Sequence, residues 1–376
     1  MTLPRTAISV LFGGPSAEHE VSLVSGRAIA AALAGAGHDV DGWLLDLDAG
    51  WWRLPSAALD PALPLQAFRD PAALGAEGPL RAAAALEMLA ARDPRPVVFP
   101  ALHGPFGEDG QVQSLLESAD LIYCGSGPAA SAVGMDKSLF KRVCGSLELP
   151  LLPWVDVRAP EHAADATGVE AGLRAFAAGF DDRRLIVKPA RLGSSIGISI
   201  VHDIDSSDEL RDALREAFRF DDLVLVEPCL DHPRELETSV MGNTRLDVVA
   251  FGPGEIKPGR EFYDYVAKYR SDESVTVAQA DLDPDLAASI RRAAVAAYLA
   301  IGAAGFARVD FLLSREGIAY VSEINTIPGF TPISLFPRMT ASGGYDFAGT
   351  CERVVELAIE RVAARPSHRL VPDDLP

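Results

Sequence analysis

The chain has 376 residues, of which 48% are hydrophobic and 23% are charged, and its formal net charge is −19. This composition is that of a globular protein, and the length predicts two or three domains rather than one. The strong negative charge argues against a nucleic-acid partner, and no apolar run has the length of a membrane span.

The cysteines and the N-terminal residues indicate the compartment. The four cysteines are widely separated and form no CxxC pair, which favours reduced thiols over disulfides or a zinc site. Residues 7–12 form an apolar run that is too short for the apolar region of a signal peptide. We therefore expect a soluble cytoplasmic protein with no membrane partner.

The first third of the chain predicts a parallel sheet whose strands end in polar loops. A strand at residues 7–12 leads into a glycine-containing loop and a helix, and a strand at residues 97–102 leads into His103. The carboxyl ends of parallel strands meet at one sheet edge, so both loops are expected there. Residues 46–96, rich in Ala, Pro and Asp, are interpreted as a surface excursion in which Trp51–Trp52 serve packing.

The rest of the chain predicts two further units of helices and strands. A glycine-rich hinge at residues 125–128 opens the second unit. Its expected elements are a helix at 136–147 carrying Lys137, a strand at 185–187 ending at Lys188, a helix at 208–218 and a strand at 223–226. The third unit predicts strands at 237–241 and 245–250, an irregular stretch at 254–272 and a helix at 284–299.

Residues 308–325 carry the most informative pattern. Two apolar runs flank a polar turn, which predicts a β-hairpin. Side chains alternate between the faces of a strand. If the turn is centred on residues 316–317, Asp310 lies opposite Glu323 and Arg308 lies opposite Asn325, all on one face.

This hairpin face predicts a metal site. Two facing carboxylates, Asp310 and Glu323, repel each other unless a cation lies between them. Together with Asn325 they supply the oxygen ligands that Mg²⁺ prefers when it also binds nucleotide phosphates. Arg308 would hold a transferring phosphoryl group or an oxyanion. The alternative is an exposed hairpin with solvated charges.

Other polar residues predict an anion site less specifically. Lys188 precedes a loop of small residues, 191–197, whose backbone N–H groups could grip phosphates, although such loops are also common connectors and this one is not a Walker A motif. Lys137 on its helix could be solvated. Glu18 could pair with an ammonium group and His103 with a carboxylate, or each could be solvated or structural.

Taken together, the motifs resemble those of the D-alanine–D-alanine ligases. They are LFGGPSAEHEVSLVSG, HGPFGEDG, MDK, VKPARLGSSIGIS, FYDYVAKYRSD and RVDF followed by EINTIPGFT. The resemblance implies an α/β (α+β) fold, the three-domain ATP-grasp fold with an N-terminal parallel-sheet domain. Its domains would span residues 1–125, 126–228 and 229–376, with ATP clamped between the second and third.

The family's activity is what the resemblance implies for this chain. ATP phosphorylates the carboxylate of one D-alanine, and the amine of a second D-alanine displaces phosphate, giving the dipeptide for peptidoglycan precursors. The implied cofactors are ATP and two Mg²⁺ ions, with Mn²⁺ as a substitute. The implied partners are these small molecules and a second copy in a homodimer.

The resemblance also carries roles onto individual residues. Asp310, Glu323 and Asn325 match the metal ligands. Lys137, Lys188 and Ser195 match groups at the ATP phosphates, and Glu227, Leu230 and Glu235 match the adenine and ribose contacts. Glu18 and His103 match the first substrate's site, and Ser194 and Tyr269 match the network that orders a flap over it. Lys268 and Arg308 match the cations around the phosphoryl group, Gly329 an oxyanion donor, and Ser334 and Leu335 the second substrate's pocket.

Two alternatives remain at this point. A D-alanine–D-lactate or D-alanine–D-serine ligase would share the fold, but lactate ligases resemble this pattern with a His in place of the pair Lys268–Tyr269. A non-catalytic nucleotide-binding regulator could lose any one of the charged site residues, and here the set is complete.

Overall fold

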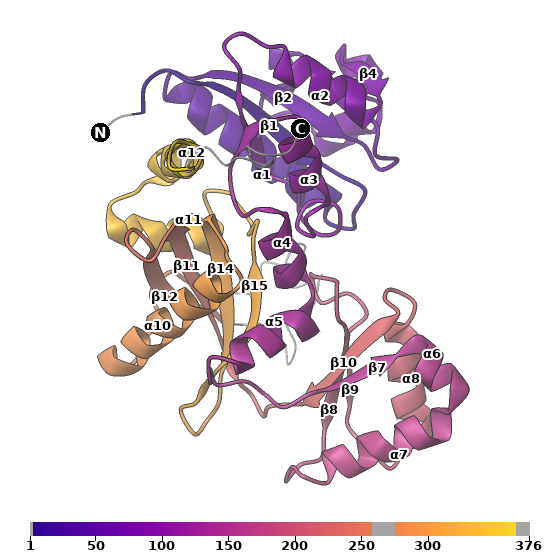
Figure 1. Ribbon diagram of the computed structural model, residues 1–376. Coiled ribbons are helices and arrows are strands. Elements are labelled where there is room, and N and C mark those ends of the chain that lie inside the picture. The colour runs from indigo at the N-terminus through magenta and orange to yellow at the C-terminus, as the bar shows by residue number, and fades with distance from the viewer. Residues whose placement is uncertain (1–2, 258–274, 366–376) are drawn as a thin grey trace, which may run out of the picture.

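A computed structural model describes residues 3–257 and 275–365. Three β-sheets organise these described residues, and Figure 1 shows them as three groups, each with its own helices. No helix in this part of the chain is long and apolar enough to cross a membrane.

The first sheet has the strand order β4-β3-β2-β1-β5-β6. Its strands are β1 (Ala7–Gly13), β2 (Asp39–Leu45), β3 (Trp51–Leu54), β4 (Glu77–Leu80), β5 (Val97–Pro100) and β6 (Ile122–Tyr123). The strands β2, β1, β5 and β6 are parallel, which confirms the parallel sheet predicted for the strands at 7–12 and 97–102. Helix α1 (His19–Gly35) packs on one face, and α2 (Ala82–Ala90) and α3 (Gln111–Ser118) pack on the other.

Residues 46–96 are not a surface excursion, and this prediction was wrong. Strands β3 and β4 extend the first sheet in antiparallel pairing. Trp51 and Trp52 are buried, which confirms their packing role, and the Trp52 indole donates to Asp46 over 2.7 Å. Arg27 on α1 donates to the backbone carbonyls of Asp60 and Leu63 and so fixes the segment that follows β3. Three 3₁₀ turns complete it, Ser56–Leu59, Leu65–Arg69 and Pro71–Leu74.

The second sheet has the order β7-β10-β8-β9 and is antiparallel. It comprises β7 (Val155–Arg158), β8 (Leu185–Pro189), β9 (Ser199–Val201) and β10 (Leu223–Pro228), with helices α6 (Ala159–Ala164), α7 (Ala166–Ala177) and α8 (Ser207–Ala217). Apolar side chains such as Val187, Val224 and Val226 pack against α7 and α8. The alternating side chains, among them Lys188 and Glu227, therefore lie on the opposite face.

The third sheet has the order β13-β12-β11-β14-β15 within the described residues. Its strands are β11 (Arg234–Gly242), β12 (Val249–Lys257), β13 (Val275–Val277), β14 (Gly305–Leu313) and β15 (Ala319–Asn325). Helix α10 (Pro284–Ala300) covers one face, where Val309 and Phe311 of β14 are buried. The stretch predicted as irregular from residue 254 onward is β12 as far as Lys257.

The hairpin register near the site is confirmed, with Asp310 opposite Glu323 and Arg308 opposite Asn325. Two differences from the predicted hairpin cancel each other and so produce this register. The loop is centred on residue 316 alone, because the Ser314 N–H donates to the Ile318 carbonyl. A bulge on β15, where Ser322 is the extra residue between the pairs 310–323 and 311–321, then restores the predicted pairing.

Segments outside the sheets join the three groups. Helices α4 (Pro128–Met135) and α5 (Lys137–Gly145) precede the second sheet in the chain but pack against β15 and α10 of the third. Helices α11 (Leu335–Thr340) and α12 (Phe347–Ala363) end the described chain, and α12 packs beside α1, β5 and β6 of the first sheet. The domain boundaries at residues 125–126 and 228–229 stay predictions.

A cluster of phenylalanines links the first sheet to the third. Phe306 of β14 lies 6.1 Å from Phe99 of β5, 5.7 Å from Phe330 and 5.6 Å from Phe336, measured between ring centroids. All four rings are buried. The cluster therefore fixes how the strands that carry polar loops approach the hairpin face.

We expect Phe306→Ala to lower the free energy of unfolding by about 3–5 kcal/mol, because it removes a fully buried ring and leaves a cavity. Urea denaturation followed by fluorescence measures this. Leu246→Ala is the matched control, since Leu246 is 97% exposed and its loss should change stability by less than about 0.5 kcal/mol. Equal denaturation midpoints for the two variants would contradict the linking role of the cluster.

Candidate active site

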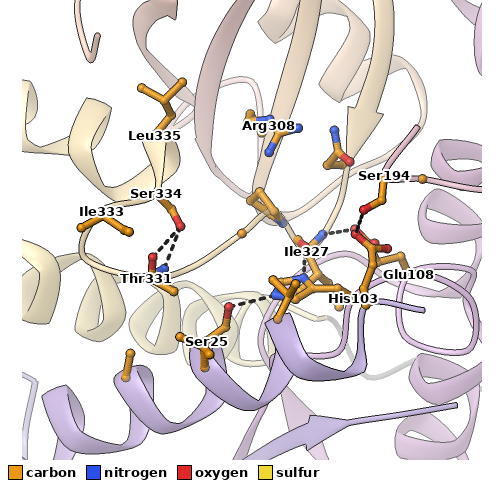
Figure 2. Close-up of a pocket in the computed structure, with 18 of the residues that line it drawn as sticks. Ser25, His103, Glu108, Ser194, Arg308, Ile327, Thr331, Ile333, Ser334 and Leu335 are labelled. Atoms are coloured by element: carbon orange, nitrogen blue, oxygen red, sulfur yellow. Dashed lines mark hydrogen bonds between the residues drawn. The ribbon is translucent and has the colours of Figure 1, made fainter. Parts of the chain in front are cut away.

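A cavity of about 1230 Å³ lies where loops from the three groups converge. Its wall draws on α1, the loop after β5, the loop after β8, the hairpin β14–β15 and the segment between β15 and α11 (Figure 2). The predicted site residues that line it are Glu18, His103, Lys137, Ser194, Arg308, Glu323, Asn325, Gly329, Ser334 and Leu335. Residues distant in sequence but predicted to act together thus share one cavity.

The hairpin contributes a network of paired charges. Arg308 holds Asp310 through two hydrogen bonds of 2.7 and 2.6 Å and lies 3.3 Å from Glu237. The Asn325 amide donates to Asp310 over 3.0 Å. Burial acts to lower the pKa of Arg308, but the charges of Asp310 and Glu237 outweigh it and hold that pKa well above its usual range. The guanidinium is therefore a permanent cation beside the cavity.

Lys137 supplies a second cation from the start of α5. Its ammonium lies 2.9 Å from Glu323 and donates to the Leu192 carbonyl over 2.8 Å, so it connects the hairpin to the loop after β8. Burial acts to lower the pKa of Lys137, but the charge of Glu323 outweighs it and the pKa is raised. Asp136 caps α5 by accepting from the Leu139 N–H, which fixes where the lysine emerges.

The hairpin residues fit a hard cation by the chemistry of their donors. Asp310 and Glu323 are cross-strand neighbours, and Asn325 adds an amide oxygen. Among the described residues no three His, Cys, Asp or Glu side chains gather as a metal group. The candidate set is two carboxylates and one amide, which leaves room for phosphate oxygens. Arg308 and Lys137 balance the two acids in this structure.

A second group of polar residues lies across the cavity. Ser194, in the loop after β8, donates to the carboxylate of Glu18, which immediately precedes α1. His103 contacts the Ile327 carbonyl through Nδ1 at 2.9 Å and the Ser25 hydroxyl through Nε2 at 3.0 Å (Figure 2). A carbonyl only accepts, so Nδ1 carries the proton and Nε2 accepts from Ser25. Burial, which outweighs the Glu18 charge, lowers the pKa of His103 and keeps the imidazole neutral.

The segment between β15 and α11 forms the far wall. Ser334 lies at the N-terminus of α11, and its hydroxyl accepts from the Thr331 N–H over 3.1 Å and lies 2.8 Å from the Thr331 hydroxyl. A Cβ at Gly329 would lie 3.5 Å from the same hydroxyl, an ordinary van der Waals contact. The compact turn presents backbone and small polar groups, while Leu335 is buried as α11 begins.

The other predicted site residues that the structure describes do not line this cavity. Asp310 is set back behind Arg308 and Asn325. Lys188 and Glu227 form a buried ion pair on the second sheet. Ser195, Leu230 and Glu235 also lie outside the lining. Lys268 and Tyr269 lie outside the described residues.

Several polar residues of the site were not predicted. Glu237 on β11 lies opposite Asp310 in the sheet register, and it opens the strand that was predicted at residues 237–241. Lys141 pairs with Glu227 and lies one helical turn after Lys137. Glu108 belongs to the HGPFGEDG motif, but no role was assigned to it.

Glu108 connects two loops that come from different sheets. One carboxylate oxygen accepts from the Gly104 N–H over 2.6 Å and the other from the Ile327 N–H over 3.3 Å. Burial first, and then the charge of Glu18, raise the pKa of Glu108 to about 8. The bridge between the loops therefore contains an acid that binds a proton more tightly than an exposed carboxyl group does.

Comparison with known proteins assigns the family. The family models described as D-ala D-ala ligase N-terminus and D-ala D-ala ligase C-terminus match residues 7–126 and 143–356. The chain belongs to the D-alanine–D-alanine ligase family. The D-alanine–D-alanine ligase of Kineococcus radiotolerans is 40% identical over 95% of this chain and 98% of its own. That of Pseudarthrobacter chlorophenolicus is 38% identical over 95% of each chain.

Solved structures of this family share the fold. The D-alanine–D-alanine ligase from Coxiella burnetii has a TM-score of 0.78 at 30% identity and covers 96% of this chain and 95% of its own. The VanG D-Ala:D-Ser ligase from Enterococcus faecalis also has a TM-score of 0.78, at 29% identity, over 94% of this chain and all of its own.

The raised pKa of Glu108 predicts a pH dependence of stability. Between its ordinary value of 4.5 and about 8, the folded protein binds more protons than the unfolded chain does. The free energy of unfolding therefore falls as pH rises through this window. We expect it to fall more steeply in the wild type than in Glu108→Gln when denaturation is measured from about pH 5 to 9.

The two proteins are compared by the slope of the free energy of unfolding against pH. Absolute values are not compared, because the substitution also changes one hydrogen bond and so shifts stability at every pH. Parallel profiles for the two proteins would show that Glu108 does not titrate with a raised pKa.

Proposed function

We propose that this chain is an ATP-dependent ligase that joins two D-alanine molecules into the dipeptide used for peptidoglycan precursors. The observation that carries the proposal is the convergence, in one cavity, of the hairpin charges Arg308, Glu323 and Asn325 with Lys137 and the Glu18–Ser194 pair. Membership of the ligase family supports the same activity.

The hairpin acids are proposed as metal ligands. Asp310, Glu323 and Asn325 would hold two Mg²⁺ ions, or Mn²⁺ in their place, and bound metal would supply positive charge to the ATP phosphates. Arg308 remains protonated because its pKa is raised, so it stabilises negative charge on the phosphoryl group during transfer. Lys137 would serve the same phosphates from its position beside Glu323.

The remaining cavity residues are proposed to bind the two amino acids. Glu18 would accept the ammonium group of the first D-alanine, with neutral His103 beside it. The carboxylate of this first D-alanine takes the γ-phosphoryl group of ATP, and ADP is the leaving group. The amine of the second D-alanine, held near Ser334 and Leu335, attacks the acyl phosphate and loses a proton. The Gly329 N–H would stabilise the tetrahedral oxyanion as phosphate leaves.

The nucleotide is proposed to bind along the second sheet. Lys188 and Glu227 lie on the sheet face opposite its apolar core, and this is the face proposed for the nucleotide. Lys188 and Ser195 would contact the phosphates. Glu227, Leu230 and Glu235 would contact adenine and ribose. The roles of Lys268 and Tyr269 rest on sequence alone.

We further propose that the protein works in the cytoplasm as a homodimer, with domains at residues 1–125, 126–228 and 229–376. The three separate sheets support this division. The family resemblance supports the homodimer.

The second candidate function is D-alanine–D-serine ligation, favoured by the equal TM-scores of the VanG D-Ala:D-Ser ligase and the D-alanine–D-alanine ligase. Phosphate release and mass spectrometry of the product, with D-alanine alone and with added D-serine or D-lactate, separate the activities. We expect D-alanine alone to give dipeptide. Phosphate release only when D-serine is added would favour the second candidate. If no substrate gives phosphate release, the ligase proposal fails and a non-catalytic nucleotide-binding regulator is the function that remains.

We expect Glu323→Gln to lower kcat by about 100-fold or more while the protein stays folded. The carboxylate charge is needed to bind cations. The fold should persist because a glutamine oxygen can still accept the hydrogen bond from the Lys137 ammonium, which lies 2.9 Å from Glu323. Steady-state phosphate release at saturating Mg²⁺ measures kcat, and circular dichroism checks the fold. Glu316→Gln, on the exposed loop of the same hairpin, is the control and should retain activity. Wild-type turnover in Glu323→Gln would sink the metal assignment.

A further inference from the structure

The second sheet and α5 enclose a group of three charges that the proposed reaction does not fully use. Lys141 of α5 and Lys188 of β8 each bind a different carboxylate oxygen of Glu227 on β10. The side chains of Lys141, Lys188 and Glu227 are 1%, 9% and 3% exposed. Water therefore screens these charges poorly, and each depends on its partners.

The group holds one positive charge more than neutrality requires. Two ammonium groups face a single carboxylate, and one lysine would neutralise it. Burial acts to raise the pKa of Glu227, but the two lysines outweigh it and keep the carboxylate ionised. Burial, aided by the charge of Lys188, lowers the pKa of Lys141 even though Glu227 opposes this. A buried excess cation is costly unless an anion completes the site.

The two lysines differ in their surroundings. Lys188 is the next-to-last residue of β8, lies on the sheet face opposite the apolar core and precedes the loop that carries Ser194. Lys141 is enclosed, with its ammonium 5.2 Å from the centre of the Trp154 ring. Lys188 is therefore the cation placed to reach a ligand, and Lys141 is the one fixed in the protein.

We propose that Lys141 is a positioning residue that neutralises Glu227 from the protein side, so that Lys188 is available to the phosphates of ATP. This inference rests on the proposed function, in which Lys188 binds those phosphates. When the ammonium of Lys188 turns to an anionic ligand, Glu227 keeps a partner and no buried charge is left alone. Without Lys141, Glu227 would retain Lys188 and compete with the nucleotide.

The test measures nucleotide binding separately from chemistry. We expect Lys141→Met, which keeps side-chain length but removes the charge, to weaken binding of the non-hydrolysable analogue AMP-PNP by about tenfold or more. Isothermal titration calorimetry with the full-length protein measures this. In steady-state assays the KM for ATP should rise by a similar factor, while the KM values for D-alanine stay within about twofold of the wild type, because Lys141 does not line the substrate cavity.

A double variant distinguishes positioning from a purely structural role. Once Glu227→Gln has removed the competing anion, adding Lys141→Met should leave the affinity for AMP-PNP the same as that of Glu227→Gln alone. Because residue 227 carries no charge in either of these two proteins, the comparison can still overturn the proposal if Lys141→Met alone fails to fold. A further loss of affinity in the double variant would overturn the proposal.

Lys188→Met separates failure of this inference from failure of the proposed function. If Lys188→Met weakens AMP-PNP binding and Lys141→Met does not, the positioning role is overturned and the nucleotide site stands. If Lys188→Met has no effect on AMP-PNP binding, the assignment of Lys188 to ATP is overturned, and the inference with it.

Discussion

The two-residue repeat of strand β14 is the constraint on which the site depends. Val309 and Phe311 pack beneath α10, so the backbone has no freedom to rotate without exposing them. The intervening Arg308 and Asp310 are consequently held toward the cavity and the neighbouring β11 and β15. A slip of one residue would exchange the two faces, burying the guanidinium and carboxylate in an apolar core. The packing of the apolar face of β14 thus determines which charged side chains lie on its other face.

Charge pairing reconciles an acidic protein with a site for an anionic ligand. The chain has an excess of 19 negative charges, but around the cavity Arg308, Lys137 and Lys188 lie directly against Asp310, Glu323 and Glu227. The neighbouring acids raise the pKa of Arg308 and of Lys137, and the lysines beside Glu227 keep its carboxylate ionised. Such pairs can exchange partners when phosphates and cations arrive together, without leaving a buried charge uncompensated.

Much of this arrangement could be predicted from sequence, where the pattern was local. The parallel order of β1 and β5 follows from apolar runs that end in polar loops, and the pairing of Asp310 with Glu323 follows from alternation around a turn. The pairing came out right although the turn centre was misplaced by half a residue, because the bulge compensates.

Predictions failed where long-range contacts decide the structure. Strands β3 and β4 have four residues each, too few to show a period, and they form because a sheet edge is available to them. Glu108 and Lys141 acquire their roles only when a loop or strand from elsewhere in the chain meets them, as Ile327 and Glu227 do. In the sequence alone, an isolated acid or a lysine on a helix does not indicate which distant segment it will contact.

The return of α12 to the first sheet has a consequence for the order in which the protein can fold. Val354, Leu357 and Ala358 belong to the same apolar core as Ile8, Phe12 and Leu33 of the opening strand and helix. Arg361 donates to the Tyr123 carbonyl over 2.9 Å, and Glu352 lies 3.2 Å from His38. During synthesis at the ribosome these partners emerge last, after more than two hundred intervening residues. The N-terminal part of the nascent chain must therefore wait with part of its apolar surface uncovered until translation is nearly complete, a period in which chaperones would have most to bind.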